Sequence, residues 1–337
     1  MKKNKVILTG GCGFVGHHVI DHILRNTNWD IYVIDKLSYS SCGLKRLREI
    51  CGLTNPRISF FSFDLCSPMP EGMIQEINDV DYILHIAAES HVDNSISDPA
   101  PFVKNNIDST LNLLEFCRKE CKNLKKFIFF STDEVFGNAK ENFNYREGDR
   151  HNCGNPYSAS KSACESICES YANTYKLPIL ITNTMNIIGE RQHKEKFVPK
   201  IIKSILNDEK IYIHSYPDLT KTGTRFYIHA RNVADAFIFI LENSTETLDC
   251  HDASKGRYNI VGVREVSNLE LVKIISKIMN KEAIYELTDF HSDRPGHDLR
   301  YALDGSKLAE LGWTPPVDLE QSLEKTVKWT IKNNQWL

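Results

Sequence analysis

The feature that most constrains the fold lies in residues 5–24, where an apolar run leads through a glycine turn into a helical pattern. The turn carries Gly10, Gly13 and Gly16, spaced three residues apart. Glycines at this place let the backbone approach a pyrophosphate, which then lies at the N-terminus of the following helix. A second apolar run ends in Asp35, where such units carry an acidic residue. The stretch therefore predicts a dinucleotide-binding unit.

Two interpretations of Asp35 are open. A carboxylate at that strand end hydrogen-bonds the ribose hydroxyls of the dinucleotide and repels a 2′-phosphate, which favours NAD over NADP. The neighbouring Lys36 weakens this preference. The alternative is that Asp35 only caps its strand. Because strand, turn, helix, second strand and acid follow in the expected order, the sequence favours NAD binding.

Four more apolar runs continue the pattern of buried parallel strands. They are residues 58–63, 82–86, 127–130 and 179–182. Asp64 and Leu65 follow the first of these runs, at a place suited to adenine. Ala87 and Ala88 follow the second, where small side chains allow close approach of a cofactor. His85 fits either a structural position or a ligand contact.

The alternation of strands and helices predicts an α/β fold, a Rossmann-type doubly wound parallel sheet. After residue 182 the pattern changes to loops, short helices and turns, which indicates a smaller mixed α/β C-terminal substrate lobe. We assign the NAD-binding domain to residues 1–182 with about 228–245, and the nucleotide-sugar-binding lobe to 183–227 and 246–337.

The fifth predicted strand and the helix after it carry the groups expected to do the chemistry. Thr132, Asp133 and Glu134 directly follow the strand, and ligands bind beyond the carboxyl ends of strands in open α/β sheets. Tyr157 and Lys161 are four residues apart, so on a helix they share one face. A lysine cation beside a phenol favours the phenolate, so we predict a lowered pKa for Tyr157. The two carboxyl groups can serve as one acid and one base.

Composition excludes several classes of partner. The 337-residue chain is 25% charged with a net charge of −3, so it offers no basic surface for nucleic acid and no cationic face for a membrane. No run approaches the ~18 apolar residues of a membrane span. The apolar run after the basic N-terminus is too short for a signal peptide. We therefore expect a cytoplasmic protein with neither a nucleic-acid nor a membrane partner.

Ten cysteines include two pairs with i,i+4 spacing, Cys117/Cys121 and Cys164/Cys168. Such pairs suit either a metal or redox site or small buried hydrophobic positions in a reducing compartment. No histidine stands at ligand spacing from them, so the sequence favours the second interpretation and predicts no metal.

Five motifs in order along the chain resemble those of the nucleotide-sugar 4,6-dehydratases, a family of the extended short-chain dehydrogenase/reductases. They lie at 10–16, 87–93, 131–137, 157–161 and 293–298. The triplet Thr132-Asp133-Glu134 is the specific part, because the sister epimerases and decarboxylases share the Tyr-x-x-x-Lys pattern but lack the Asp-Glu pair. The resemblance implies a tightly bound NAD that is consumed and regenerated in each turnover.

The resemblance also implies a role for each catalytic residue. Tyr157 takes the proton of the sugar 4-hydroxyl as hydride leaves C4 for NAD⁺, and Thr132 hydrogen-bonds the 4-oxygen. Lys161 lowers the pKa of the tyrosine and holds the nicotinamide ribose. Glu134 removes the C5 proton while Asp133 protonates the departing 6-hydroxyl, and hydride returns to C6. The implied reaction converts an NDP-glucose to NDP-4-keto-6-deoxyglucose and water.

The residues expected to touch ligands form two sets. The cofactor set is Gly10, Gly13, Phe14, Val15, Gly16, Asp35, Lys36, Asp64, Leu65, Ala87, Ala88, Tyr157 and Lys161. The substrate set is Glu89, Ser90, His91, Thr132, Asn186, Lys196, Arg225, Asn259, Arg294 and His297. The loop at 293–298 carries cations that suit a diphosphate, although such a loop taken alone fits a solvated surface loop as well.

Some positions depart from the family pattern. Where the family usually has Arg, Tyr and Pro around Asn186, this chain has Asn183, Ile188 and Glu190. The turn at 214–223 is also longer than its family counterpart and different. These departures lie near the expected base and ribose contacts, so the nucleotide stays open between dTDP and UDP.

Two other functions compete with the dehydratase. A 4-epimerase or decarboxylase of the same superfamily is disfavoured by the Asp-Glu pair, and an inactive NAD-binding scaffold is disfavoured by the complete catalytic set. The family also suggests a homodimer, built from a helix at 106–121 and the helix that carries Tyr157. The apolar face of the first helix, Ile107, Leu111 and Leu114, fits either this interface or the core.

Overall fold

A seven-stranded parallel sheet forms the centre of the computed structural model, which describes residues 3–50, 52–289 and 299–337. The strand order is β10-β6-β5-β4-β1-β2-β3, and every neighbouring pair is parallel. The strands are β1 (Lys5–Thr9), β2 (Asp30–Asp35), β3 (Ile58–Ser62), β4 (Tyr82–His85), β5 (Lys126–Thr132), β6 (Ile179–Thr184) and β10 (Arg257–Ile260). The predicted Rossmann-type sheet is thereby confirmed.

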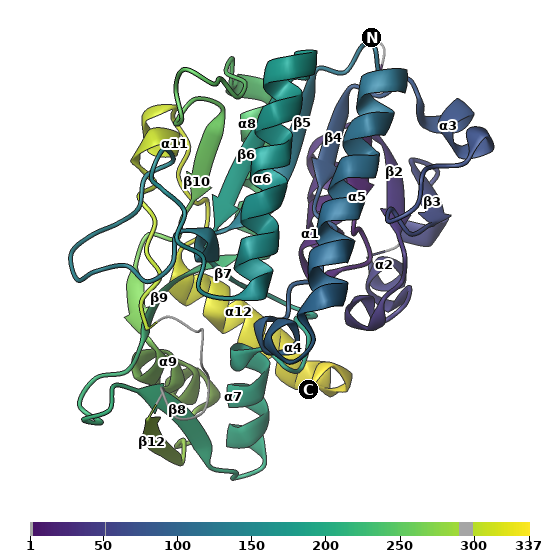
Figure 1. The fold of residues 1–337 in the computed structure, drawn as a ribbon. Helices are drawn as coiled ribbons and strands as arrows, with labels where there is room; N and C mark the ends of the chain where they lie inside the picture. The colour runs from purple at the N-terminus through teal and green to yellow at the C-terminus, as the bar shows by residue number, and fades with distance from the viewer. Residues whose placement is uncertain (1–2, 51, 290–298) are drawn as a thin grey trace.

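Helices cover both faces of the sheet, which is why its strands are near-continuous apolar runs (Figure 1). One face packs against α1 (Phe14–Asn26), α2 (Lys45–Glu49), α8 (Ala230–Asn243) and α11 (Ser306–Glu310). The other face packs against α3 (Glu71–Ile77), α5 (Pro99–Glu120) and α6 (Pro156–Tyr175). Neighbouring strand residues alternate between the two cores, so Leu8 packs toward α1 and Ile7 toward α5.

The smaller lobe is mixed α/β. It contains a three-stranded sheet in the order β11-β9-β7 and a parallel pair of β12 and β8. Its elements are β7 (Asn186–Ile188), α7 (Phe197–Leu206), β8 (Ile211–Ser215), β9 (Thr224–His229), β11 (Glu265–Ser267), α9 (Asn268–Met279), β12 (Tyr285–Asp289) and α12 (Leu319–Lys332). Apolar side chains of α7, α9 and α12 form a core separate from those of the large sheet.

Three elements differ from those expected from the sequence. Helix α5 begins at Pro99 rather than near residue 105, because proline is well tolerated in the first helical turn. Strand β7 forms inside the segment expected to be a loop, since it pairs with β9. Strand β10 falls in the range assigned to the smaller lobe, yet its pairing with β6 makes it the edge strand of the large sheet.

The four cysteines with i,i+4 spacing, Cys117, Cys121, Cys164 and Cys168, lie in the core between the sheet and the helices α5 and α6. Each is at most 5% exposed, so they pack as small hydrophobic side chains, as the favoured interpretation predicted. Among the described helices, none combines the length and the apolar character that crossing a membrane requires.

Candidate active site

The glycine turn after β1 packs closely against the chain that follows β4. Gly10 has a φ of +72°, and a Cβ atom there would lie 2.9 Å from the backbone of Ala87. A Cβ atom on Gly16 would lie 2.2 Å from the carbonyl oxygen of Gly10, so α1 starts directly on the turn. Because no side chain covers this backbone, a pyrophosphate can reach the N-terminus of α1. The turn therefore fits a dinucleotide.

His85 holds the same junction together from inside the core. Its Nδ1 lies 2.8 Å from Thr9 Oγ1, and its Nε2 lies 3.1 Å from Thr110 Oγ1. Thr9 Oγ1 in turn accepts hydrogen bonds from the backbone N–H groups of Ile86 and Ala87. Complete burial lowers the pKa of His85 to about 3, so the ring is neutral. Of the two open interpretations, the structural one is correct.

A pocket opens beside the glycine turn, with an empty volume of about 1180 Å³ that includes open solvent at its mouth. Every residue of the predicted cofactor set lines it, together with Glu89, Ser90 and Lys196 of the substrate set. Seven polar residues that the motifs did not mark also line it: Ser38, Ser40, Ser41, Asn105, Ser109, Gln192 and His193. The serines could have been found from their position just after Asp35, whereas Asn105 and Ser109 reach the pocket only through the packing of α5.

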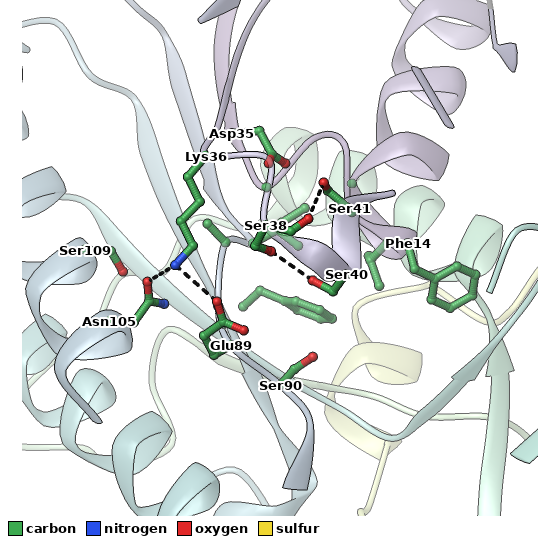
Figure 2. Close-up of a pocket in the computed structure, with 18 of the residues that line it drawn as sticks. Phe14, Asp35, Lys36, Ser38, Ser40, Ser41, Glu89, Ser90, Asn105 and Ser109 are labelled. Atoms are coloured by element: carbon green, nitrogen blue, oxygen red, sulfur yellow. Dashed lines mark hydrogen bonds and ion pairs between the residues drawn. The ribbon is translucent and has the colours of Figure 1, made fainter. Parts of the chain in front are cut away.

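Lys36 reaches across this pocket toward α5 (Figure 2). Its Nζ donates a hydrogen bond of 2.6 Å to Asn105 Oδ1 and lies 3.1 Å from Glu89 Oε1. The lysine charge is therefore balanced by a carboxylate from the chain after β4. This pairing reduces the attraction that a lone lysine beside Asp35 would offer a 2′-phosphate.

Asp35 has the structural features that both open interpretations require. Its Oδ2 accepts a hydrogen bond from the backbone N–H of Cys12, and its Oδ1 accepts one from Leu37. The carboxylate thus fastens the glycine turn to the end of β2, as a cap would, and it also lines the pocket. Burial raises the pKa of Asp35, and the two N–H donors oppose that shift.

The triplet predicted to be catalytic lies where β5 ends. Thr132 is the last strand residue, and Asp133 and Glu134 begin a short 3₁₀ turn (Asp133–Val135). Thr132 Oγ1 donates to Asp133 Oδ1 over 3.1 Å and accepts from the backbone N–H of Glu134. The threonine hydroxyl therefore orients both acidic residues.

Asn155 connects the triplet to the helix that carries Tyr157. Its side chain accepts a hydrogen bond from the backbone N–H of Ser158, and Ser158 Oγ closes a capping box at the start of α6. The Nδ2 of Asn155 donates to Glu134 Oε2 over 2.9 Å. The same side chain starts the helix and holds the carboxylate of Glu134. The helix cap was readable from Asn155-Pro156, but the contact with Glu134 was not.

The environment of Asp133 favours its protonated form. Burial raises its pKa to about 7, and the charge of Glu134 adds to the shift, while Thr132 and Arg225 oppose it. Its Oδ2 is buried without a hydrogen-bond partner among the described residues. A neutral carboxyl at this position has a hydroxyl free to donate, which agrees with the predicted division into one acid and one base.

The predicted lowering of the Tyr157 pKa is wrong for the protein by itself. Burial raises the pKa of Tyr157, the charges of Glu134 and Asp133 raise it further, and only a hydrogen bond with Thr132 opposes them. Burial likewise lowers the pKa of Lys161, whose Nζ lies 4.1 Å from the centre of the Phe129 ring. The i,i+4 spacing correctly placed both residues on the pocket, but it could not show how strongly burial acts on the pKa of each.

The remaining substrate-set residues differ in placement. His91 caps α4 (Val92–Ser97), and its Nε2 lies 3.4 Å from Glu195 Oε2. Arg225 lies 4.5 Å from the ring centre of Tyr301 and donates to two backbone carbonyls, those of Thr224 and Leu299. The structure brings Arg225 close enough to Asp133 to oppose its pKa shift.

Five described members of the substrate set are not part of the pocket lining: His91, Thr132, Asn186, Arg225 and Asn259. Asn186 is exposed on β7. Asn259 is fully buried, and its Nδ2 donates to the carbonyls of Tyr145 and Asp304. Arg294 and His297 lie outside the described residues.

The three departures from the family pattern have packing roles. Asn183 and Ile188 are at most 1% exposed, the first among polar groups and the second in the core of the smaller lobe. Glu190 is buried, accepts a hydrogen bond of 2.9 Å from His229 Nε2 and forms an ion pair with Arg231. None of the three lines the pocket beside the glycine turn.

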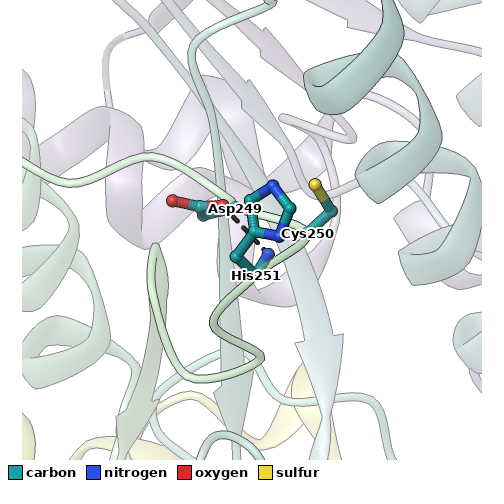
Figure 3. Close-up of side chains that lie close together, drawn as sticks. All are labelled: Asp249, Cys250 and His251. Atoms are coloured by element: carbon teal, nitrogen blue, oxygen red, sulfur yellow. Dashed lines mark hydrogen bonds between the residues drawn. The ribbon is translucent and has the colours of Figure 1, made fainter.

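One cluster of potential metal ligands lies away from this pocket within the described part of the chain. Oxygen, sulfur and nitrogen atoms of Asp249, Cys250 and His251 lie within 4.8 Å of one another (Figure 3). Asp249 already accepts from Lys255 Nζ and from the backbone N–H of His251, and the other two side chains are exposed. Next to this cluster, the backbone N–H of Leu248 donates a hydrogen bond to the carbonyl of Ile179, the first residue of β6. The cluster therefore lies at the amino ends of the strands, whereas the pocket lies at their carboxyl ends.

Comparison with known proteins decides the family. A family model described as GDP-mannose 4,6 dehydratase matches residues 7–326. The dTDP-glucose 4,6-dehydratase of Haemophilus influenzae is 36% identical and covers 98% of this chain and 98% of its own length. The chain belongs to the nucleotide-sugar 4,6-dehydratase family.

Solved structures place this 4,6-dehydratase family member beside two kinds of enzyme. The dTDP-glucose 4,6-dehydratase of Streptomyces venezuelae, crystallised with NAD, has a TM-score of 0.84 at 29% identity and covers 98% of both chains. The UDP-glucuronic acid 4-epimerase of Bacillus cereus, crystallised with UDP-glucuronic acid and NAD, has a TM-score of 0.85 at 25% identity over 98% of this chain and 99% of its own. Because one fold serves both reactions, the choice between them rests on the catalytic residues.

Replacing Asp35 with asparagine should weaken the binding of NAD by about tenfold or more, because a hydrogen bond to a charged group is worth about 1.5–3 kcal/mol. Calorimetric titration of the cofactor-free protein with NAD measures the change. Asp30→Asn, at the other end of β2, is the matched control and should bind NAD as the wild type does. An unchanged NAD affinity together with a lowered melting temperature would show that Asp35 is only a cap.

The carboxyl group of Asp133 should titrate with a midpoint of about 7. The midpoint can be measured from the carboxyl resonances of protein labelled with ¹³C-aspartate, assigned by the signal that Asp133→Asn removes. Glu134→Gln should lower the midpoint, because it removes the charge that contributes to the raised pKa. A wild-type midpoint near the ordinary aspartate value of about 3.9 would contradict the assignment of Asp133 as the acid.

Proposed function

We propose that the protein is a 4,6-dehydratase of nucleotide-linked glucose, which converts dTDP-glucose or UDP-glucose to NDP-4-keto-6-deoxyglucose and water. The observation that carries this proposal is the pair Asp133 and Glu134, two neighbouring carboxyl groups in unlike environments close to Tyr157. Elimination of water needs one protonated and one ionised carboxyl group at the same time. A 4-epimerisation has no step that uses such a pair.

The residues divide the reaction between the two elements that carry them. From α6, Tyr157 takes the proton of the 4-hydroxyl, and Thr132 at the end of β5 exchanges its hydrogen bond to Asp133 for one that it donates to the 4-oxygen. Glu134 then removes the proton at C5, which the neighbouring 4-ketone has made acidic. Asp133 gives its proton to the 6-hydroxyl as that group leaves as water, and Glu134 returns a proton to C5 when hydride adds to C6. The raised pKa of Asp133 keeps this proton available near neutral pH.

The pocket supports NAD as the cofactor of this reaction. The glycine turn, Asp35 and Lys161 would hold its pyrophosphate, its adenosine ribose and its nicotinamide ribose, in that order. When bound, NAD accepts the hydride from C4, returns it to C6 and adds positive charge to the pocket that Tyr157 lines. That charge opposes the upward pKa shift that burial and the two carboxyl groups cause in Tyr157.

The direct test is turnover of the purified protein on dTDP-glucose and UDP-glucose in parallel, without added cofactor. The expected result is loss of the mass of one water, with the 4-ketone of the product identified by NMR. The preferred nucleotide answers the question left open by the altered loops. If neither sugar nucleotide loses water even with NAD supplied, while UDP-sugars are epimerised, the epimerase alternative replaces this proposal.

Glu134→Gln locates the block inside the reaction. The variant should still oxidise C4, so the absorbance of NADH should build up while neither product nor solvent deuterium at C5 appears. Tyr157→Phe should show no NADH signal, because the first proton transfer is lost. Glu141→Gln, on the exposed loop before α6, is the matched control and should turn over as the wild type does. Normal deuterium incorporation in Glu134→Gln would remove the glutamate from its role.

We also infer a homodimer. The apolar face of α5 that would form its interface differs from the one predicted from the sequence. Leu114 is fully buried in the core, whereas Leu111 is 38% exposed and lies one turn from Ile107 and two turns from the exposed Val103. Val103 and Leu111, with the partly buried Ile107 between them, form a stripe on α5 that a partner helix could cover. Leu111→Glu should therefore halve the molar mass measured by light scattering. Ile331→Glu, equally exposed on α12, is the control, and two variants of equal mass would contradict this interface.

A further inference from the structure

A buried carboxylate lies behind the catalytic pocket and has no place in the chemistry above. Glu165 is on α6, one turn after Lys161, and has no exposed surface. It accepts hydrogen bonds from Ser131 Oγ at 2.5 Å, from Asn183 Nδ2 at 2.9 Å and from Arg257 Nη1. His151 Nε2 lies 3.5 Å from its Oε2. Glu165 is therefore held by four residues from outside its own helix.

Three of these partners come from three neighbouring strands. Ser131 is on β5, Asn183 is its register partner on β6, and Arg257 is on β10, the edge strand beside β6. Their side chains converge on one carboxylate of the helix that packs over them. The network therefore fixes α6 in rotation and height above this part of the sheet.

The network also reaches the catalytic strand end directly. Ser131 immediately precedes Thr132, and Asn183 Nδ2 donates a second hydrogen bond of 3.1 Å to the backbone carbonyl of Thr132. The backbone that leads into Asp133 is thus attached on one side to β6 and on the other to Glu165. Glu134 has its own attachment to the start of α6 through Asn155.

A stabilising role alone does not account for this arrangement. Removing charges from water is costly, and well-packed apolar residues in place of a buried ion pair often stabilise a protein as much or more. Directional hydrogen bonds do what apolar packing cannot, because they fix one geometry. The reaction requires such a geometry, since its proton acceptor Tyr157 is on α6 while Thr132, Asp133 and Glu134 follow β5.

We propose that Glu165 is a positioning residue, which sets the distance and angle between Tyr157 and Lys161 on α6 and the triplet after β5. It acts through Ser131 and Asn183, and Arg257 balances its charge. This inference rests on the proposed dehydratase function for its kinetic consequences, although its structural content does not. A displacement of about 1 Å in a catalytic site can lower the rate about 100-fold. Loss of the network should therefore lower kcat by a measurable amount.

The test compares Ser131→Ala, Glu165→Gln and the double variant with the wild type. Each single variant should lower kcat roughly 10- to 100-fold, with unchanged KM, NAD content and melting temperature within a few degrees. The double variant should be no slower than the slower single variant, because both changes break the same connection. If Glu165→Gln does not fold, Asn183→Ala takes its place in the comparison.

Glu169→Gln is the matched control. Glu169 is also a partner of Arg257, but it lies one turn further along α6, is partly exposed and contacts neither Ser131 nor Asn183. This variant removes a carboxylate charge from the same arginine and should leave kcat unchanged. A fall in kcat equal to that of Glu165→Gln would show that the charge of Arg257 matters, and not the connection to β5, and would overturn the proposal.

Amide hydrogen exchange supplies a readout that does not depend on turnover. The amides of residues 132–137 should exchange faster in Ser131→Ala and Glu165→Gln than in the wild type and in Glu169→Gln, because the strand end is less firmly held. Unchanged exchange in both variants overturns the inference whatever the kinetics show. Losses of kcat that multiply in the double variant would instead mean that Ser131, which lines the pocket, acts on a ligand directly. If the wild type turns over neither sugar nucleotide, the proposed function fails and the exchange result alone decides this inference.

Discussion

The direction of the strands is the constraint on which the site depends. All seven strands of the large sheet run parallel, so their carboxyl ends all lie on the same side of the sheet. The glycine turn follows β1, Asp35 ends β2, Ala87 follows β4 and Thr132 ends β5, which brings four distant segments into one place. The close approach of Gly10 to Ala87 shows how little room separates these segments, because even a single added Cβ atom would overlap the backbone of the next segment.

Local signals in the sequence were sufficient for most of this arrangement. Strand–turn–helix order gave the sheet, and every residue expected to hold the cofactor lines one pocket. Helix α5 was placed correctly but started too late, since Pro99 belongs to its first turn. The strand β10 and the hydrogen bond from Asn155 to Glu134 were not predicted, because both depend on which distant segments meet rather than on neighbouring residues. The network of Glu165 was invisible for the same reason, as its arginine stands 92 positions further along the chain.

Burial decided the electrostatics where charge spacing alone gave the wrong sign. The prediction for Tyr157 counted a nearby cation and omitted the removal of the phenol from water, which raises its pKa. For Asp133, burial and the neighbouring carboxylate act in the same direction, so the predicted acid has the environment of one. The buried pair of Glu190 and His229 shows the opposite outcome, because the hydrogen bond and charges around Glu190 hold its pKa well below the usual range despite burial. Residue type and spacing suggest which groups interact, and the depth of each group then determines which effect is larger.

The double role of Asn155 limits how the two halves of the chemistry can change independently. Its side-chain oxygen begins the helix that presents Tyr157, while its nitrogen holds Glu134 in place. A substitution there shifts both Tyr157, which we propose serves the oxidation at C4, and Glu134, which we propose serves the elimination. A substitution that changes one step alone must therefore lie at another position. Position 155 is a poor place to begin evolving a new activity, but a single change there should disable both steps.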